Sequence, residues 1–135
     1  METLLLSDSC PGDIEKAGEI LRQGGLVAIP TETVYGLAAN ALDGEAVKNI
    51  YQAKGRPSDN PLIVHISDVS QLPPLVKEVP EAARKLAAVF WPGPLTIILE
   101  KSSRIPDQTS GGLDTVAVRC PYHPTARAVI DAAGV

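Results

Sequence analysis

The chain has 135 residues, which fits one domain with room for a true hydrophobic core. Hydrophobic residues make up 44%, charged residues make up 21% and the net charge is −4, so the bulk electrostatics do not indicate a nucleic-acid or anionic-membrane surface. No apolar run is long enough to cross a bilayer, and the amino terminus lacks the pattern of a signal peptide.

The first part of the chain predicts a strand, a helix and a second strand. Residues 3–6 form a short strand candidate, and Ser7–Ser9 then offer helix-capping side chains. Apolar residues recur at helical spacing over residues 14–21, and Gly24-Gly25 is placed to end that helix. The apolar run of residues 26–29 then predicts a buried strand.

A dense group of polar side chains follows this buried strand. After Pro30 come Thr31, Glu32, Thr33 and Tyr35. Such residues near prolines are by default turn formers and caps. The carboxyl ends of strands in open α/β sheets are also where ligands bind, so a small-molecule site is an equally good interpretation.

The middle of the chain predicts a helix, a second polar loop and another strand. Asp43 is a suitable N-cap for a helix that extends to residue 54. The loop that follows reads KGRPSDNPL, residues 54–62, and residues 62–66 predict a strand. Residues 68–79 are mixed, because a Pro-Pro pair forbids one continuous helix.

The second half predicts a helix, a rigid turn, a strand, a mobile loop, a further strand and a final helix. These elements span residues 81–90, 91–94, 95–99, 101–114, 116–118 and 124–132. The first of these helices is expected to bury Ala83, Leu86, Ala87 and Phe90 on its apolar face. Gly134 is expected to stop the last helix. The alternation of strands and helices predicts an α/β fold with at least some parallel pairing.

The basic loop is the best candidate for an anion site. Lys54 and Arg56 flank Gly55 at the end of a predicted helix, where an ammonium and a guanidinium can clamp a polyphosphate. Either residue alone is better explained as a complement to the helix dipole. Asn60 and two prolines in the same string favour a site. Neither a P-loop nor a Rossmann fingerprint is present, so any ATP is held in another way.

Two further polar residues lie on predicted strands. His65 lies within an apolar strand, where a histidine is more often a satisfied core residue than a catalyst. Arg119 ends a strand and requires a carboxylate partner, which is Asp114, Glu32 or a substrate.

The two cysteines, Cys10 and Cys120, lie in unrelated contexts. Reduced thiols in a cytoplasmic protein explain them best. Nothing in the sequence indicates metal ligation by protein side chains. No Ser/His/Asp or Cys/His arrangement indicates a covalent nucleophile.

Four motifs in the same order resemble the Sua5/YciO/YrdC family, the threonylcarbamoyl-AMP synthases. They are PTETVYGL (30–37), KGRPSDNPL (54–62), WPGPLT (91–96) and TVAVRCPYHP (115–124). Their order over nearly the whole chain makes the resemblance specific. It implies a twisted, open, mixed α/β sheet with flanking helices, of the YrdC/RibB type, across residues 1–135.

The resemblance also implies an activity. The family joins L-threonine, bicarbonate and ATP to give L-threonylcarbamoyl-adenylate and pyrophosphate, which is nucleotidyltransferase chemistry. It implies Mg²⁺ bound with the nucleotide, and no protein-bound metal or prosthetic group. Partner machinery then passes the threonylcarbamoyl group to adenosine 37 of tRNAs. No membrane partner is implied.

Matching the motifs position by position gives the expected site. The threonine contacts are Thr33, His65 and Arg119, and the ATP contacts are Arg56, Asn60 and Thr115. Lys54 and Arg56 would carry catalysis, because positioning and charge stabilisation are expected to do the work instead of a side-chain nucleophile.

The family pattern continues past the last predicted helix into a strand and a Ser-Ala-Asn motif. This sequence stops at Val135, so we expect an incomplete YrdC-like domain over residues 1–135 and leave open whether it is active alone. One alternative is an RNA-binding or regulatory module on the same fold, which the net charge of −4 disfavours. Another is the carbamoyl-transfer domain of hydrogenase maturation, which belongs to longer chains with zinc-finger motifs.

Overall fold

Strands and helices alternate along the chain. The computed structural model describes residues 4–7, 9–10, 12–30, 35–54 and 62–134. The helices are α1 (Asp13–Arg22), α2 (Gly44–Lys54), α3 (Glu81–Phe90), α4 (Asp107–Ser110) and α5 (Pro124–Ala133), with 3-10 turns at Val69–Gln71 and Pro73–Leu75. The strands are β1 (Val27–Pro30), β2 (Tyr35–Ala38), β3 (Ile63–His65), β4 (Thr96–Glu100) and β5 (Thr115–Arg119).

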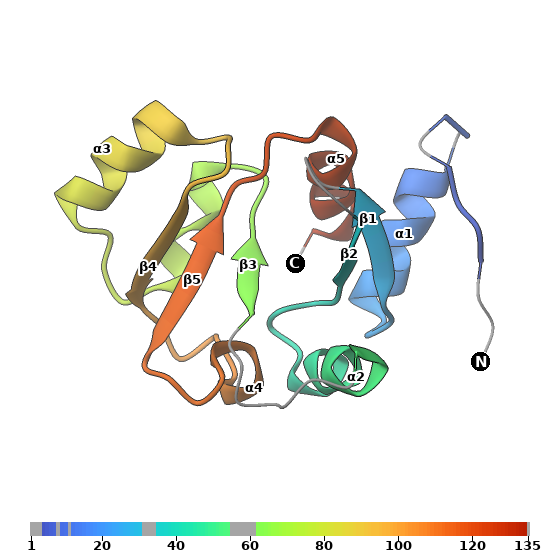
Figure 1. Cartoon of the computed structure of the whole chain (residues 1–135), viewed down its shortest axis with the longest axis horizontal. Helices are drawn as coiled ribbons and strands as arrows, with labels where there is room; N and C mark the ends of the chain where they lie inside the picture. Colours follow the sequence, from blue (N-terminus) through green and yellow to red (C-terminus); the bar gives the residue numbers. More distant parts are fainter. Residues whose placement is uncertain (1–3, 8, 11, 31–34, 55–61, 135) are drawn as a thin grey trace.

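The described strands form two sheets (Figure 1). The larger has the order β3-β5-β4, with β5 in the centre. β3 runs parallel to β5 and β4 runs antiparallel to it, so this sheet is mixed. β1 and β2 pair as an antiparallel hairpin beside α1 and α5. The predicted α/β class with some parallel pairing is confirmed.

One face of the three-stranded sheet forms the main hydrophobic core. Val116 and Val118 of β5 are 1% and 0% exposed and pack with Val64 of β3. Ile97 of β4 packs against the buried alanines of α3. Because alternate strand residues point to opposite faces, the residues between these belong to the other face of the sheet.

A second hydrophobic cluster joins α1, β1 and α5. Its buried members are Ala17, Leu21, Ile29, Ala126, Val129 and Ala133. Gly18 allows α1 to approach α5 closely, since a Cβ there would lie 2.5 Å from the carbonyl carbon of Ala132. Arg22 of α1 donates hydrogen bonds to the Ala132 and Ala133 carbonyls, where the last turn of a helix favours positive charge. The last helix is therefore anchored to the first.

Local capping signals set several helix boundaries as predicted. The Asp43 carboxylate accepts hydrogen bonds from the backbone N–H groups of Glu45 and Ala46, at 3.1 and 3.4 Å, and so caps α2. Gly134 has a φ of 64° and ends α5 in the left-handed conformation. Gly24, with a φ of 88°, follows the end of α1.

Two predictions near the amino terminus are wrong. Residues 4–6 form no strand, and Leu5 is fully exposed, so an apolar run alone did not recruit a pairing partner. The N-cap of α1 is Gly12, without a side-chain cap, instead of one of Ser7–Ser9. The side chain that accepts a hydrogen bond here is that of Asp13, the first residue of α1, and the donor is the backbone N–H of Ser7, at 2.9 Å.

The strand that follows α1 also differs from its prediction. Only Ile29 of β1 is buried, because β1 pairs in a two-stranded hairpin instead of lying inside a parallel sheet. The partner strand, β2, was not predicted. The polar residues 31–34 lie outside the described residues.

Two more corrections concern the second half. Leu86 and Phe90 of α3 are 43% and 52% exposed, since only the alanine stripe of that helix meets the sheet. Residues 101–114, predicted as a mobile loop, contain α4 and the buried side chains of Thr109 and Ser110, at 0% and 1% exposure. Hydrogen bonds to other elements hold this stretch in place.

Candidate functional site

The uncovered face of the three-stranded sheet carries a row of polar side chains. In the strand register His65 of β3 is aligned with Arg119 of β5, and Arg119 is aligned with Thr96 of β4. Aligned residues share a face, so an imidazole, a guanidinium and a hydroxyl lie side by side. All three residues are half-buried. Such a row can bind a small ligand that carries a carboxylate and hydrogen-bonding groups.

The turn at residues 91–94 orients Arg119. The Trp91-Pro92 peptide is cis, and the Trp91 indole donates to the Leu95 carbonyl at 2.8 Å. The Gly93 N–H donates to the Cys120 carbonyl at 2.9 Å, which fixes the turn against the end of β5. In return, Nε of Arg119 donates to the Gly93 carbonyl at 3.2 Å. The turn therefore holds one edge of the guanidinium group.

An apolar row lies next to the polar row on the same face. Ile63, Ala117 and Ile98 are aligned across β3, β5 and β4. Ile63 is 46% and Ile98 65% exposed, and they lie on β3 and β4, the two strands that flank β5. The exposed apolar row shows that the described helices leave this face uncovered.

Thr115 lies on the same face at the other end of β5. It is aligned with Glu100 of β4. Arg119 lies four positions after Thr115, which corresponds to about 13 Å along a strand. Because β3 and β5 are parallel, His65 and Arg119 lie at the carboxyl ends of their strands and Thr115 lies at an amino end. The face thus has two polar regions with an apolar row between them.

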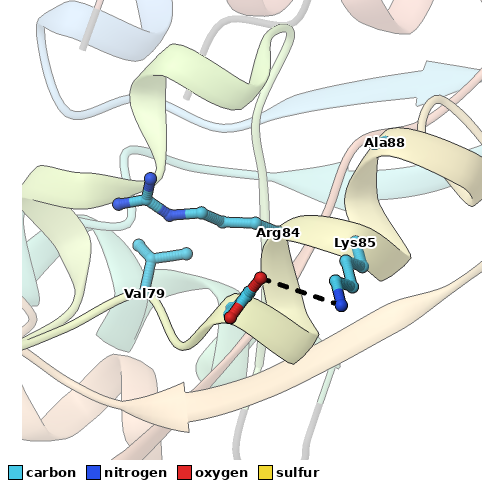
Figure 2. Close-up of a pocket in the computed structure, with 5 residues that line it drawn as sticks. Val79, Arg84, Lys85 and Ala88 are labelled. Atoms are coloured by element: carbon cyan, nitrogen blue, oxygen red, sulfur yellow. Dashed lines mark ion pairs between the residues drawn. The ribbon is translucent and has the colours of Figure 1, made fainter.

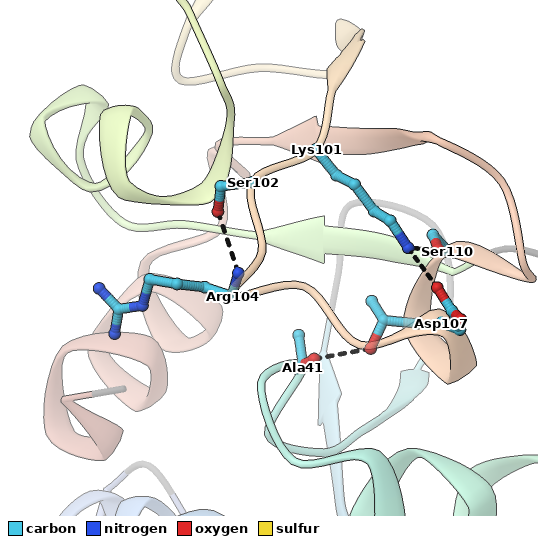
Figure 3. A network of polar contacts seen from close by, with 7 residues as sticks. Ala41, Lys101, Ser102, Arg104, Asp107 and Ser110 are labelled. Atoms are coloured by element: carbon cyan, nitrogen blue, oxygen red, sulfur yellow. Dashed lines mark hydrogen bonds and ion pairs between the residues drawn. The ribbon is translucent and has the colours of Figure 1, made fainter.

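The amino-terminal end of the face is built around α4. The Thr109 hydroxyl donates to the Ala41 carbonyl at 2.6 Å, and the Thr109 carbonyl accepts from the Leu62 N–H at 3.0 Å. The Tyr51 hydroxyl donates to the Gln108 carbonyl at 3.1 Å. Figure 3 shows Lys101 extending toward Asp107 and Ser110, with Ala41 close by.

Lys101 completes this polar network. Its Nζ donates to Asp107 Oδ1 at 2.6 Å and to Ser110 Oγ at 2.8 Å, and its side chain is only 15% exposed. Its backbone N–H donates to the Asp114 carbonyl, directly before β5. The network therefore connects α4 to the end of β4 and the start of β5.

The predicted site residues fall into two groups. His65, Arg119 and Thr115 lie on one sheet face. Lys54 is the last residue of α2, and Thr33, Arg56 and Asn60 lie outside the described residues.

Burial raises the pKa of the Cys120 thiol, at the end of β5. The pKa of Asp68 is lowered, chiefly by hydrogen bonds from Ser70. Cys10 is exposed, and both cysteines are free. Neither Cys120 nor Asp68 belongs to the polar row, so these shifts do not mark a catalytic group.

A pocket elsewhere on the molecule contains none of these site residues. It lies along α3 and is lined by Val79, Glu81, Arg84, Lys85 and Ala88 (Figure 2). Its ion pair, Lys85 to Glu81 at 3.7 Å, is largely exposed and therefore weak. Within the described parts of the chain, no three His, Cys, Asp or Glu residues gather to hold a metal.

Sequence reasoning missed several residues that shape the site. Residues 91–94 were predicted as a rigid turn and as part of a family motif, with no contact to Arg119, whereas the Gly93 carbonyl accepts a hydrogen bond from Arg119. Lys101 and Thr109 were assigned to a mobile loop. Thr109 and Ser110, which precede two glycines, could have indicated an ordered segment, since buried hydroxyls often donate hydrogen bonds to backbone carbonyls.

The fold and the site define an α/β domain whose mixed sheet has one uncovered face, with a polar row at one end of that face and a threonine hydroxyl at the other. A family model for Sua5/YciO/YrdC, described as telomere recombination, matches residues 19–135. The chain therefore belongs to the Sua5/YciO/YrdC family, and its fold is YrdC-like.

Similar proteins agree with this assignment. The chain is 59% identical over 118 residues to the threonylcarbamoyl-AMP synthase of Pyrococcus abyssi, covering 87% of this chain and 35% of that protein. It is 54% identical over 123 residues to the Bacillus subtilis threonylcarbamoyl-AMP synthase, covering 90% and 36%. The crystal structure of P. abyssi Sua5 complexed with L-threonine superposes with a TM-score of 0.93 at 52% identity, covering 98% of this chain and 40% of that one.

The chain spans about a third of the length of these two curated relatives. It is homologous to one domain of threonylcarbamoyl-AMP synthases. In the described residues, every helix is too short or too polar to serve as a transmembrane span.

Proposed function

We propose that this chain supplies the substrate-binding face of a threonylcarbamoyl-AMP synthase. The observation that carries the proposal is the alignment of His65 with Arg119 on the uncovered sheet face. The structural similarity to a Sua5 protein complexed with L-threonine supports it. Threonine would bind at this row through Thr33, His65 and Arg119, with its carboxylate on the guanidinium.

ATP would bind toward the other end of the same face. Thr115 lies there, and the segment that carries Arg56 and Asn60 rejoins the described chain at Leu62, beside α4. The exposed row of Ile63, Ala117 and Ile98 would form an apolar floor between the two substrates. Binding both substrates on one rigid sheet would lower the entropic cost of bringing them together.

The chemistry we propose has two steps. The threonine amine attacks bicarbonate and, with loss of water, forms a carbamate. A carbamate oxygen then attacks the α-phosphorus of ATP, the bond from that phosphorus to the bridging oxygen breaks, and pyrophosphate leaves. Lys54 and Arg56 would stabilise the charge that develops on the leaving group.

Mg²⁺ would enter with the nucleotide and supply additional charge neutralisation on its phosphates. The product would then be used by a threonylcarbamoyl-transfer system acting on tRNA in the cytoplasm.

Pyrophosphate release tests the proposal. We expect the 135-residue chain to release pyrophosphate from ATP only when L-threonine and bicarbonate are both present. The same assay on a chain extended beyond Val135 is the comparison. Release without threonine, or no release from either chain, would contradict the proposed activity.

A further inference from the structure

The short helix α4 contacts three segments that are distant in the sequence. Its own four residues contain two of the most buried polar side chains in the described chain, Thr109 and Ser110. Around it lie the end of α2, the start of β3 and the start of β5 (Figure 1). A four-residue helix has little stability of its own, so these contacts hold it in place.

The contacts lie on both sides of the basic string of residues 54–62. Tyr51, three residues before Lys54, donates to the Gln108 carbonyl at 3.1 Å. Leu62, the last residue of the string, donates through its N–H to the Thr109 carbonyl at 3.0 Å. Tyr51 is 4% exposed, so its hydroxyl reaches α4 from within the core. One helix is therefore bonded to the chain just before this string and to the last residue of the string.

The same helix is tied to the strand that carries Thr115. Nζ of Lys101 donates hydrogen bonds to the side chains of Asp107 and Ser110 in α4. The Lys101 backbone N–H donates to the carbonyl of Asp114, the residue before Thr115. In Figure 3 the lysine side chain reaches the helix along this path. The Thr109 hydroxyl adds a fourth tie, to the Ala41 carbonyl before α2. Tyr51, Leu62 and the chain just before Thr115 are therefore all bonded, directly or through Lys101, to α4.

We propose that Tyr51, Thr109 and Lys101 are positioning residues for the nucleotide, acting through α4 on the flanks of residues 54–62 and on Thr115. This inference rests on the proposed function. Threonine binding should depend on it much less, because His65 and Arg119 lie at the opposite ends of their strands, about 13 Å from the Thr115 row. A substitution that disturbs α4 should therefore weaken the binding of ATP and leave the affinity for L-threonine nearly unchanged.

The experiment measures ATP and L-threonine dissociation constants by calorimetry on the full chain with Mg²⁺. Tyr51→Phe removes only the hydroxyl, and Thr109→Val removes the hydroxyl at nearly constant volume. Each is expected to weaken ATP about threefold to tenfold, the range for one lost hydrogen bond, with threonine changed less than twofold. Thr109→Ser should restore ATP affinity, because it returns the hydroxyl.

Ser102→Ala is the matched control. It removes a hydroxyl that donates to the Pro74 carbonyl at 2.7 Å, on the neighbouring loop, and should leave both affinities unchanged. If the wild-type chain binds ATP, and Tyr51→Phe and Thr109→Val bind it with the same affinity, this inference would be overturned while the proposed function would stand. Equal weakening of both ligands would overturn it too, since that indicates general loss of structure. Failure of the wild-type chain to bind ATP would overturn the proposed function and this inference together.

Discussion

Cys120 and Cys10 occupy opposite environments. Cys120 is 3% exposed at the end of β5, whereas Cys10 is exposed near the amino terminus. We expect one thiol per chain to react quickly with a thiol reagent and the second to react only on unfolding. In a Cys10→Ser variant the fast phase should disappear. A fast phase that persists in that variant would show that Cys120 is accessible.

The raised pKa of Cys120 gives this residue a pH-dependent role in stability. Its folded-state pKa lies above the unfolded value, so the folded state keeps the proton more tightly. The stabilisation is complete below the unfolded pKa and is lost as pH rises through the folded pKa. Urea unfolding should therefore show stability falling at alkaline pH, with a shallower fall in Cys120→Ala. An equal fall in both proteins would assign the pH effect to other groups.

Substitutions of Arg119 and Arg56 are expected to affect the binding of different substrates. Arg119→Ala should weaken L-threonine about tenfold to a hundredfold, the range for a lost charge-assisted hydrogen bond, with a small effect on ATP. Arg56→Ala should do the reverse. Calorimetry with each substrate measures both, and Arg104→Ala, at an exposed position, controls for loss of a positive charge. Equal effects of Arg119→Ala and Arg56→Ala on both ligands would mean that the roles are misassigned.

At the scale of elements, the contact between α1 and α5 depends on a missing side chain. A Cβ at position 18 would lie 2.5 Å from a backbone carbon of α5, and backbone cannot rotate away as a side chain can. Gly18→Ala should therefore lower the free energy of unfolding by about 1–3 kcal/mol, despite the better helix propensity of alanine. Urea unfolding measures the change. Glu15→Ala, exposed on the same helix, should change little, and a stabilised Gly18→Ala would show that the helices can move apart.

Elements with clear periodicity and caps were predictable from the sequence. The bounds of α2 and α3 agree with the prediction, and those of β3, β4, β5 and α5 differ from it by one residue at one or both ends. The hairpin strand β2 was missed because its four residues, YGLA, contain a glycine and follow a polar run. The short helix α4 was missed because its stability comes from distant partners, which local sequence does not show.

The candidate site was predictable only in part, for a related reason. Residue types and motif resemblance pointed to His65, Arg119 and Thr115, but sequence does not give strand register. Register is what places His65 beside Arg119 and sets Thr115 at the opposite end of the face. The contact of Arg119 with Gly93 joins residues 26 positions apart and had no local signal.

Across the whole molecule, protection from hydrogen exchange should be uneven. β5 is paired on both sides and holds Val116 and Val118, which are 1% and 0% exposed, so its amides should exchange slowest. The β1–β2 hairpin, with two strands and one buried residue in β1, should exchange faster. Exchange measured by NMR on the full chain checks this order. Protection of the hairpin equal to that of β5 would indicate that the two sheets unfold as one unit.

The anchoring of α5 to α1 also sets an order of assembly. Arg22 and Ala132 are 110 positions apart, and half of the buried members of their shared cluster come from α5. On a ribosome, the amino-terminal helix and hairpin would emerge early yet lack a complete core until translation reaches the last helix. The three-stranded sheet depends on closer partners and can form before then. Residues 13–30 would therefore complete their core only after α5 has been made, and would depend on chaperones until then.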